Sequence, residues 1–464
     1  MRTCLTQEII AICLTLCLYS STVFAQQEKK AWPPVNVVDG LGVSVHWRGE
    51  LDKSSAVINP LTNSEIEQQA NLIADTGLKI IREDIHWQWK NKSKDRIDFS
   101  RQHVIYDICR SHGLRLMTVL AFVDPRFENR WGISTEEGRQ SFARFCGQAV
   151  KEFKGKGIIW EMWNEANSST FWASKATGIR NSTQEYMAAM RLAIKTMRES
   201  DPDCIIIAPS SATFDKRFFE SCFQAGLLDD ISAVSVHPYC DSPEWNMSRY
   251  LELQNLINTY SSKTRNKLPI INSELGFSRV FLNLGRRIRS EDEQAALMIR
   301  SILIDQIAGV PVHIIYTNRD YDANLTWDQA SFGIVAHDGK PKSAFKAIKN
   351  FTTQLNGCAF GGILEVGTND IFERNVEDNA IYFNGSNSVL VVAWTSAAKH
   401  MAKVQLPGIP RSIISMKGES IPLPADTGNP KEHLGRKVAI ELSVEPVYIR
   451  IERKDMDDPN NEML

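Results

Sequence analysis

A repeating pattern of short apolar runs and amphipathic segments covers residues 41–355 of this 464-residue chain. After each run, apolar residues recur with helical spacing, which is the pattern of a strand followed by a helix. Most runs are apolar at consecutive positions, as expected for parallel strands covered by helices. Eight such units favour a closed (β/α)8 TIM barrel, an α/β fold, over a doubly wound sheet. The expected strands cover residues 41–47, 78–84, 114–122, 158–163, 205–208, 231–236, 268–273 and 312–316.

Local signals between these strands support the same fold. Ser134 and Glu137 match the capping box that starts many helices, and Ser290 with Glu293 is expected to open another helix. No glycine-rich phosphate loop follows the first expected strand, which argues against a dinucleotide-binding fold.

The pattern changes near residue 357. From there the chain shows short apolar runs, little helical periodicity and tight-turn signals such as Asn384-Gly385. This predicts a small C-terminal antiparallel β-sandwich. We therefore expect a catalytic barrel over residues 33–356, a sandwich over 357–453 and a polar tail over 454–464.

Residues 1–25 predict a secretory signal peptide. Arg2 precedes a mostly apolar segment that is too short to span a bilayer, and Val23-Phe24-Ala25 matches a small-residue cleavage pattern. A retained membrane anchor is the alternative. No later segment is apolar enough to cross a membrane. We therefore expect an exported protein that is periplasmic, secreted or at the cell surface.

The composition excludes several kinds of partner and site. The formal net charge is −2 with no basic stripe, so no nucleic-acid partner is expected. The nine cysteines show no CxxC spacing, which argues against a zinc site. Buried free thiols are the default expectation for those beyond the signal, because a large core does not need disulfides.

Two glutamates stand at the ends of expected strands. Glu165 follows the fourth strand in Trp163-Asn164-Glu165, and Glu274 ends the seventh. The strands of such a barrel present their carboxyl ends at one mouth, so both carboxylates can face one cavity. Glycoside hydrolysis requires such a pair: one carboxyl protonates the leaving oxygen, and the other attacks the anomeric carbon or activates water. These residues alone leave retention and inversion open.

Several motifs carry a family resemblance. Trp163-Asn164-Glu165, His237-Pro238-Tyr239, Ser273-Glu274 and Ile81-Arg82 resemble the pattern of clan A glycoside hydrolases. Residues 332–341 resemble the segment before the last helix in family 39-like members, and a barrel followed by a sandwich fits that family too.

The resemblance implies a retaining double displacement on a β-linked glycan, with no metal or cofactor. Glu165 is implied as the acid/base and Glu274 as the nucleophile. Asn164 is implied to bond the sugar 2-hydroxyl, and Tyr239 to orient the nucleophile. Arg82 is implied to keep that carboxylate ionised. His237 is implied to line the subsite.

Further candidates for substrate binding are His46, Trp87, Asp124, Tyr316 and Trp327. The chain departs from the clan pattern in two places. Its eighth strand ends in Tyr316 rather than a tryptophan, and Asn167-Ser168-Ser169 replaces a proline-containing turn.

Structural roles compete with each assignment. Arg82 could pair with a neighbouring acid, His237 could be a core histidine, and any tryptophan could be core packing. The functional alternatives are a β-xylosidase or β-1,3-glucanase of the same clan, a transglycosylase, or a catalytically idle glycan-binding protein. The oligomeric state stays open.

Overall fold

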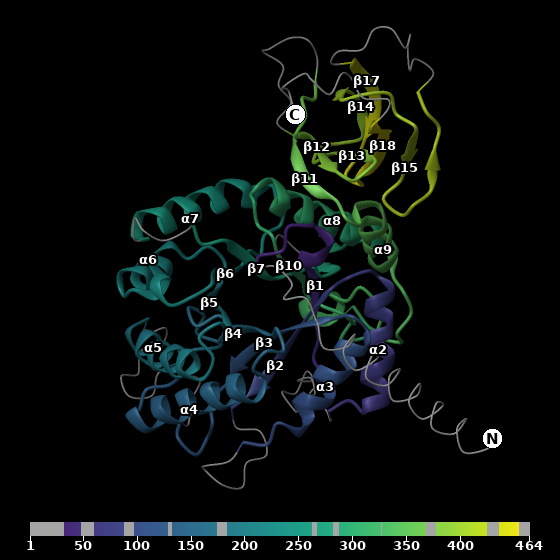
Figure 1. Ribbon diagram of the computed structural model, residues 1–464. Coiled ribbons are helices and arrows are strands. Elements are labelled where there is room, and N and C mark those ends of the chain that lie inside the picture. Colours follow the sequence, from purple (N-terminus) through teal and green to yellow (C-terminus); the bar gives the residue numbers. More distant parts are fainter. Residues whose placement is uncertain are drawn as a thin grey trace, which may run out of the picture.

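The computed structural model describes residues 32–47, 60–87, 97–128, 132–173, 183–261, 267–281, 287–325, 327–367, 377–424 and 436–453. Eight parallel strands form a closed barrel ringed by helices, and the C-terminal strands pack beside it (Figure 1). The expected signal peptide and polar tail lie outside the described residues. Within the described part of the chain, no helix is both long enough and apolar enough to cross a membrane.

The barrel strands follow the predicted pattern. In order they are β1 (Leu41–Ser44), β2 (Ile80–His86), β3 (Arg115–Ala121), β4 (Ile159–Met162), β5 (Ile205–Ala212), β6 (Ala233–His237), β7 (Ile270–Leu275) and β10 (His313–Ile315). Strand β10 pairs with both β7 and β1, and this pairing closes the barrel. The predicted α/β barrel is therefore confirmed.

The surrounding helices are α2 (Asn63–Asp75), α3 (Ser100–Ser111), α4 (Glu136–Glu152), α5 (Thr183–Ser200), α6 (Lys216–Gln224), α7 (Asn246–Tyr260), α8 (Glu291–Ile307) and α9 (Ser343–Leu355). The capping box of Ser290 and Glu293 is confirmed at the start of α8. The box expected at Ser134 is wrong, because the N-cap of α4 is Thr135, which accepts a bond from the Gly138 amide. Both Ser134 and Thr135 instead donate their backbone N–H groups to Glu128.

The barrel interior has two layers of different character. One layer is apolar and consists of Ile80, Met117, Ile159, Ile207, Ala233, Ile271, Val312 and Ile314. Gly42 makes room in this layer, since a Cβ there would lie 2.6 Å from the Ile314 Cδ1 atom. Two residues farther along β2 and β4, the interior positions hold Arg82 and Glu161, both buried. Charges at such depth persist only when they are paired and hydrogen-bonded.

The C-terminal region contains two antiparallel sheets. The larger has the order β11 (Ala359–Ile363), β12 (Asp378–Asn384), β13 (Ser388–Thr395), β18 (Val447–Glu452), β15 (Ser412–Ile414) and β16 (Ser420–Ile421). The smaller pairs β14 (His400–Leu406) with β17 (Arg436–Leu442). A short hairpin, β8 (Val280–Phe281) with β9 (Arg287–Ile288), lies after β7.

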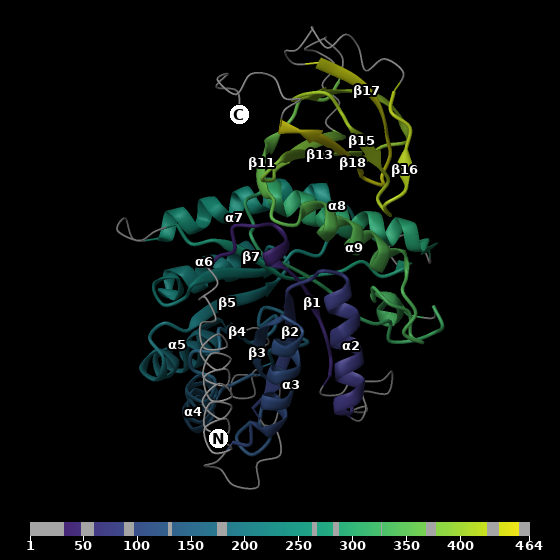
Figure 2. The same cartoon turned by 45° about the vertical axis from the view of Figure 1, so that its right-hand side comes forward.

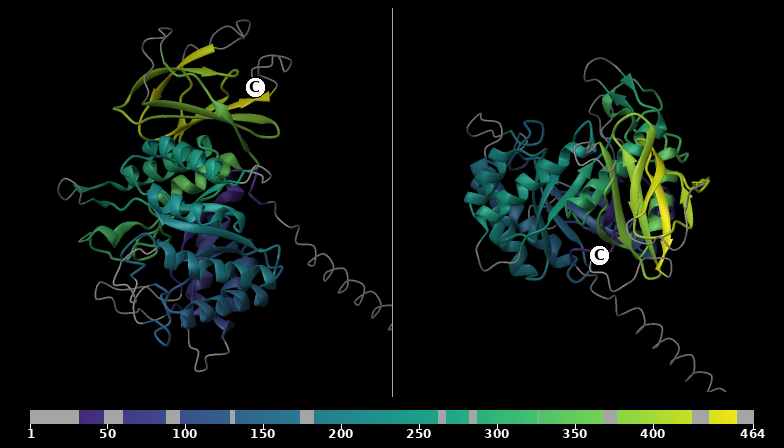
Figure 3. Two further views of the ribbon diagram at one scale, coloured as in Figure 1. Left: turned by 90° about the vertical axis from the view of Figure 1, so that its left-hand side faces the viewer. Right: turned by 90° about the horizontal axis from the view of Figure 1, so that it is seen from above.

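Alternate residues of β13 serve two cores. Val389 and Val391 join the core shared with β14 and β17, whereas Val392 and Trp394 join the barrel core. This is the period-two pattern of a strand buried on both faces. Figures 1 to 3 show the larger sheet lying against the α8 and α9 side of the barrel.

Glu244 links these two regions. It lies in the short 3-10 helix η3 (Pro243–Trp245), just after β6. Its carboxylate accepts bonds from Arg300 of α8 at 2.6 and 2.8 Å and from the Trp394 indole of β13 at 3.1 Å. This buried ion pair fixes the sheet to the barrel near the mouth.

Candidate active site

The two expected carboxylates meet at the mouth of the barrel. One oxygen of Glu165, one oxygen of Glu274 and a ring nitrogen of His237 all lie within 4.8 Å of one another. The Glu274 side chain is 11% exposed and the Glu165 side chain 15% exposed, so both can be reached from solvent. The ends of the fourth and seventh strands thus place Glu165 and Glu274 close together at the barrel mouth.

Arg82 connects the nucleophile candidate to two residues of the fourth-strand segment. Its Nη1 donates to Glu274 at 2.6 Å, its Nε to Glu161 at 2.6 Å and its Nη2 to the Asn164 side-chain oxygen at 2.8 Å. The guanidinium is buried, and although burial opposes the charge, Glu161 and Glu274 raise the pKa of Arg82. Arg82 therefore remains a fixed cation.

His237 contacts the other glutamate. Its Nδ1 lies 2.9 Å from Glu165, and its Nε2 lies 3.4 Å from Glu161. Burial lowers the pKa of His237, but Glu274, Glu161 and Glu165 outweigh burial and raise it to about 9. The ring is thus an imidazolium near neutral pH, donating from both nitrogens.

Tyr239 completes the surroundings of Glu274. Its hydroxyl donates to the second oxygen of that carboxylate at 2.8 Å. Burial and the neighbouring Glu274 raise the pKa of Tyr239, so the phenol stays protonated. Glu274 therefore accepts bonds from Arg82 on one oxygen and from Tyr239 on the other.

Asp84 and His86 extend the charged row along β2. The His86 Nε2 lies 3.6 Å from Asp84, and both side chains are about 30% exposed. Burial opposes ionisation of Asp84, but His86, Arg82 and His46 lower its pKa to about 2. Asp84 is therefore an anion at the mouth.

An aromatic rim lies beside Glu274. We define it as His46, Tyr316, Tyr321, Trp327 and Phe332. Ring-centroid distances between its neighbouring members run from 5.3 to 6.5 Å. Phe332 also packs edge-on against Tyr239 at 6.4 Å. The structure thus places the candidates His46, Tyr316 and Trp327 in one continuous group next to the nucleophile candidate.

The histidine of this rim is neutral. Burial lowers the pKa of His46, and its buried Nε2 has no hydrogen-bond partner among the described residues. A neutral imidazole keeps one nitrogen that can accept a hydrogen bond and one that can donate.

Two expected binding residues lie elsewhere. Trp87 is 2% exposed, stacks on Phe127 at 5.5 Å and meets Phe142 edge-on, so its ring belongs to the core. Asp124 is 1% exposed, and both of its carboxylate oxygens bind Arg126. Both side chains are therefore enclosed by protein groups in this structure, and their contact with substrate stays a prediction. Trp87 is held by packing, and Asp124 by the turn that it closes.

Glu161 is a further buried charge of the site that was not predicted from the sequence. This side chain is fully buried, and Arg82 and His237 lower its pKa to about 2 although burial opposes this. A signal was present, because Glu161 stands two residues after Ile159 and two before Trp163 in an otherwise apolar run. Strand alternation places such a residue inside the barrel, where a carboxylate needs a partner.

The backbone around Glu165 is unusual. Trp163 has φ 67° and Glu165 has φ 48°. Residues other than glycine enter this left-handed region at a cost of about 1–3 kcal/mol each. The Glu165 amide donates to the Ser210 carbonyl at 2.9 Å. Asn167 bonds the backbone of Ala212 through both ends of its amide, at 2.8 and 2.9 Å. Asn167 thus anchors the turn after Glu165 to β5. In the clan pattern this turn contains a proline.

Close backbone contact brings β7 to β10. A Cβ at Gly276 would lie 1.9 Å from the Tyr316 carbonyl oxygen, so only glycine fits there. The Tyr316 amide donates to the Leu275 carbonyl at 2.9 Å. The rim therefore sits directly against the strand that carries Glu274.

A buried ion pair holds the loop that carries the rim. Lys342 is 2% exposed and lies 3.0 Å from both oxygens of Asp320. The same ammonium donates to the Gly333 carbonyl at 2.9 Å and to the Ser331 hydroxyl at 3.3 Å. These bonds join the two ends of the segment between β10 and α9.

The cluster of Glu165, His237 and Glu274 has the spacing of a possible metal site. A metal bound here would have to displace the proton of His237, whose pKa is raised to about 9. Both oxygens of Glu274 are also engaged, by Arg82 and Tyr239. The described residues of this cluster fit an acid/base pair better.

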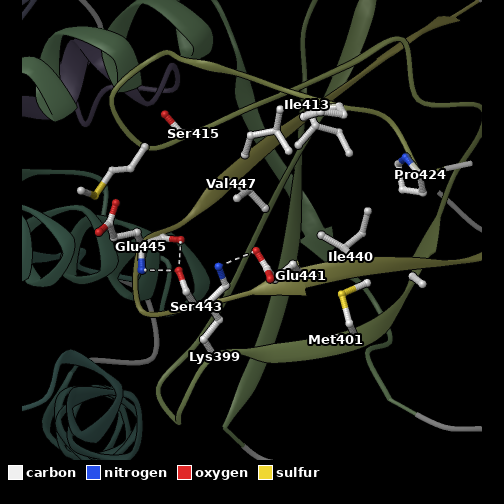
Figure 4. A pocket seen from close by; sticks show the side chains of 14 residues that line it. Lys399, Met401, Ile413, Ser415, Pro424, Ile440, Glu441, Ser443, Glu445 and Val447 are labelled. Carbon is white, nitrogen blue, oxygen red and sulfur yellow. Dashed lines mark hydrogen bonds and ion pairs between the residues drawn. The ribbon is translucent and has the colours of Figure 1, made fainter.

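Other cavities lie away from this cluster. One of about 340 Å³ lies in the C-terminal sheets, beside the Lys399–Glu441 ion pair of 2.7 Å (Figure 4). Another of about 550 Å³ lies between α6 and α7. Neither Glu165 nor Glu274 lines either cavity. The six cysteines beyond residue 100 are free thiols, as expected.

Comparison with known proteins agrees with this geometry. The sequence model described as cellulase (glycosyl hydrolase family 5) matches residues 39–307. None of the curated proteins matches the sequence significantly.

Several solved structures share the fold. A family 39 glycoside hydrolase from Bacteroides cellulosilyticus WH2 is 19% identical, with a TM-score of 0.71 over 90% of this chain and 81% of that chain. A family 39 enzyme from Xanthomonas axonopodis pv. citri is 15% identical, with a TM-score of 0.59 over 91% and 96%. A family 30 endoxylanase from Clostridium papyrosolvens C71 is 15% identical, with a TM-score of 0.57 over 89% and 96%.

The predicted clan is thus confirmed, whereas the matching family model is that of family 5, and the likeness to family 39 is one of fold. The chain belongs to the cellulase family, glycosyl hydrolase family 5, within clan A, and is a glycoside hydrolase.

Proposed function

We propose that this glycoside hydrolase cleaves β-linked glycans by a retaining double displacement. Glu274 is the nucleophile and Glu165 the acid/base. The observation that carries this proposal is the close approach of the two carboxylates at the barrel mouth, where one oxygen of each lies within 4.8 Å of the other. Retaining enzymes hold the two carboxyl groups about 5–5.5 Å apart, whereas inverting enzymes leave about 6.5–9.5 Å for a water.

In the first step, a Glu274 oxygen attacks the anomeric carbon while Glu165 gives its proton to the leaving oxygen. The glycosyl group then forms an ester with Glu274. Arg82 and Tyr239 support this role, because their bonds at 2.6 and 2.8 Å favour an ionised, oriented carboxylate before attack. In the second step, Glu165 takes a proton from water, which attacks the anomeric carbon and frees Glu274.

His237 supports the change of role at Glu165. Its Nδ1, at 2.9 Å, holds one oxygen of that carboxyl, which leaves the other to face the leaving group and then the water. Asn164 has its amide oriented by Arg82, with the oxygen accepting at 2.8 Å. This directs the amide N–H groups away from the guanidinium and toward the sugar 2-hydroxyl, a bond that strengthens in the transition state.

We assign the sugar platform to the aromatic rim. Tyr316 and Trp327 are both half-buried aromatic residues of this rim, the type of side chain on which sugar rings stack. We also propose that the protein is exported through its N-terminal signal. Sequencing the mature N-terminus tests this, since cleavage after Ala25 supports it and an intact Met1 contradicts it.

A substrate panel with a matched variant tests the proposed function. Wild type and Glu274→Gln are assayed against β-linked polysaccharides, including xylan and β-1,3-glucan, and against aryl glycosides, with product analysis. We expect wild type to release shorter products, and we expect the rate of hydrolysis to fall by at least about 10⁴-fold in Glu274→Gln. Hydrolysis of xylosides or of β-1,3-glucan alone selects one of the two narrower alternatives. Longer products indicate transglycosylation. A wild type as inert as the variant, with sugar binding retained, overturns the proposal in favour of a binding protein.

A further inference from the structure

One fully buried carboxylate has no assigned task in the reaction described above. Glu161 lies inside the barrel, two residues beyond the apolar layer at Ile159, and is 0% exposed. Each of its oxygens has its own partner: one accepts from the Arg82 Nε at 2.6 Å and the other lies 3.4 Å from the His237 Nε2.

The two partners lead to different catalytic groups. Arg82 continues to Glu274 at 2.6 Å and to Asn164 at 2.8 Å. His237 continues to Glu165 at 2.9 Å. A single side chain, Arg82, therefore links Glu161 to the nucleophile, and a single side chain, His237, links it to the acid/base.

We propose that Glu161 is a positioning residue of the reaction, a buried anion that orients Arg82 and His237 together and, through them, both catalytic carboxylates. The expected effect of Glu161 on the reaction rate rests on the proposed function. The geometry of the linkage is independent of any substrate.

The charges support this role. The cations Arg82 and His237 lie among the anions Glu161 and Glu274, with Asp84 also acting on Arg82. Buried charges are tolerated when such groups compensate one another. Without the Glu161 charge, Arg82 and His237 would both lose the anion that they share, and the imidazolium is the partner that can lose a proton.

Loss of that proton would alter the contact with Glu165. The groups that face His237 are Glu161 and Glu165 from the β4 segment, Glu274 from β7 and, through Glu161, Arg82 from β2. Each of the three acids raises the pKa of His237. Glu161 is the one among them that takes no part in bond making, so it can be changed without removing a reacting group.

The test compares Glu161→Gln with Glu83→Gln. Glu83 is a matched control, since it is another buried glutamate on a barrel strand, β2, and its carboxylate accepts the Trp47 amide. For Glu161→Gln we expect kcat to fall about 10²-fold with KM within about threefold, because the loss is felt mainly in the transition state. The basic limb of the pH profile of kcat/KM should move down by about one pH unit or more, as His237 loses an anionic partner. Glu83→Gln should keep the wild-type profile.

A second readout does not depend on catalysis. Nuclear magnetic resonance of labelled histidines, with His237 assigned from the His237→Gln variant, follows the imidazole titration directly. We expect His237 to titrate near 9 in wild type and markedly lower in Glu161→Gln. If Glu161→Gln does not fold, Glu161→Asp, which keeps the charge, should keep the wild-type basic limb.

An unchanged basic limb and an unchanged His237 titration in Glu161→Gln would overturn the inference, whatever the loss of rate. So would a wild-type His237 that titrates below about 7, near its ordinary value. If wild type hydrolyses no glycoside, the proposed function fails, while the titration still tests the link between Glu161 and His237.

Discussion

The two sides of the barrel mouth are held together by different forces. On the reaction side, Arg82, Glu161, Glu165, His237 and Glu274 form one network of contacts between 2.6 and 3.4 Å. On the aromatic rim, ring contacts of 5.3 to 6.5 Å dominate, on a loop after β10.

Directional bonds between strand residues tolerate little change, whereas ring packing on a loop can be altered with less loss. The chemistry of the reaction is thus fixed more rigidly than the surface that recognises the sugar. Changes on the reaction side should therefore affect kcat, and changes on the rim should affect KM.

The largest difference is expected at Glu165. In Glu165→Gln, cleavage of a glycoside with a poor leaving group should fall about 10²–10⁴-fold, since no acid remains to protonate the leaving oxygen. An activated aryl glycoside, whose leaving group needs no proton, should lose far less in its first step. The measurement is kcat/KM for both substrates. Equal losses on the two would contradict the assignment of Glu165 as the acid.

The anchor of the rim comes next. Lys342→Met leaves Asp320 buried without its ammonium, which should cost about 3–5 kcal/mol of unfolding free energy and raise KM by loosening the loop. Urea unfolding and steady-state kinetics measure both effects. Lys340→Met is the matched control, because its ion pair with Asp338 is exposed. If both variants unfold at the same urea concentration, the anchor has no such role.

The reaction network should make stability depend on pH. The pKa of His237 is raised from 6.5 to about 9, so its contribution is complete below pH 6.5 and is lost as the pH rises through 9. The loss should amount to about 3 kcal/mol between pH 6.5 and well above 9. Urea unfolding across that range measures it. His237→Gln should remove this part of the alkaline dependence; an identical dependence in the variant would rule out His237 as its source.

The smallest effects are expected on the rim itself. Trp327→Ala should raise KM about three- to tenfold with kcat nearly unchanged, as loss of one stacking surface predicts. Trp87→Phe should lower stability while leaving KM unaltered, because Trp87 is a core residue. Kinetics and thermal unfolding separate the two. If KM rose in Trp87→Phe but not in Trp327→Ala, Trp87 would be the substrate-binding residue and Trp327 would not.

The sequence predicted side chains on or next to the barrel strands better than the surroundings of Trp87 and Asp124, for physical reasons. Glu165, Glu274 and Arg82 lie on or next to barrel strands, and strand position determines where their side chains converge. The burial of Trp87 and Asp124 could not be predicted, because it depends on Phe127 and Arg126 in the turn that follows β3. Such tertiary contacts leave no periodic pattern in a sequence.

Glu161 was missed for another reason. Strand alternation places Glu161 inside the barrel, but its partners Arg82 and His237 lie on β2 and β6, far from it in the sequence, so no neighbouring residue indicated the pairing. The eight strands and the separate C-terminal sheets follow from periodicity, whereas the start of α4 depends on Glu128, which lies six residues before Ser134 in the chain.

The stereochemistry of the first product tests the two-glutamate mechanism most directly. Proton nuclear magnetic resonance can follow the hydrolysis of a β-glycoside that the enzyme cleaves. Spectra recorded before mutarotation identify the anomer that is released first. With carboxylate oxygens within 4.8 Å, a retaining displacement at Glu274 predicts that the β-anomer appears first. Initial release of the α-anomer would mean inversion and would contradict the assignment of Glu274 as a nucleophile.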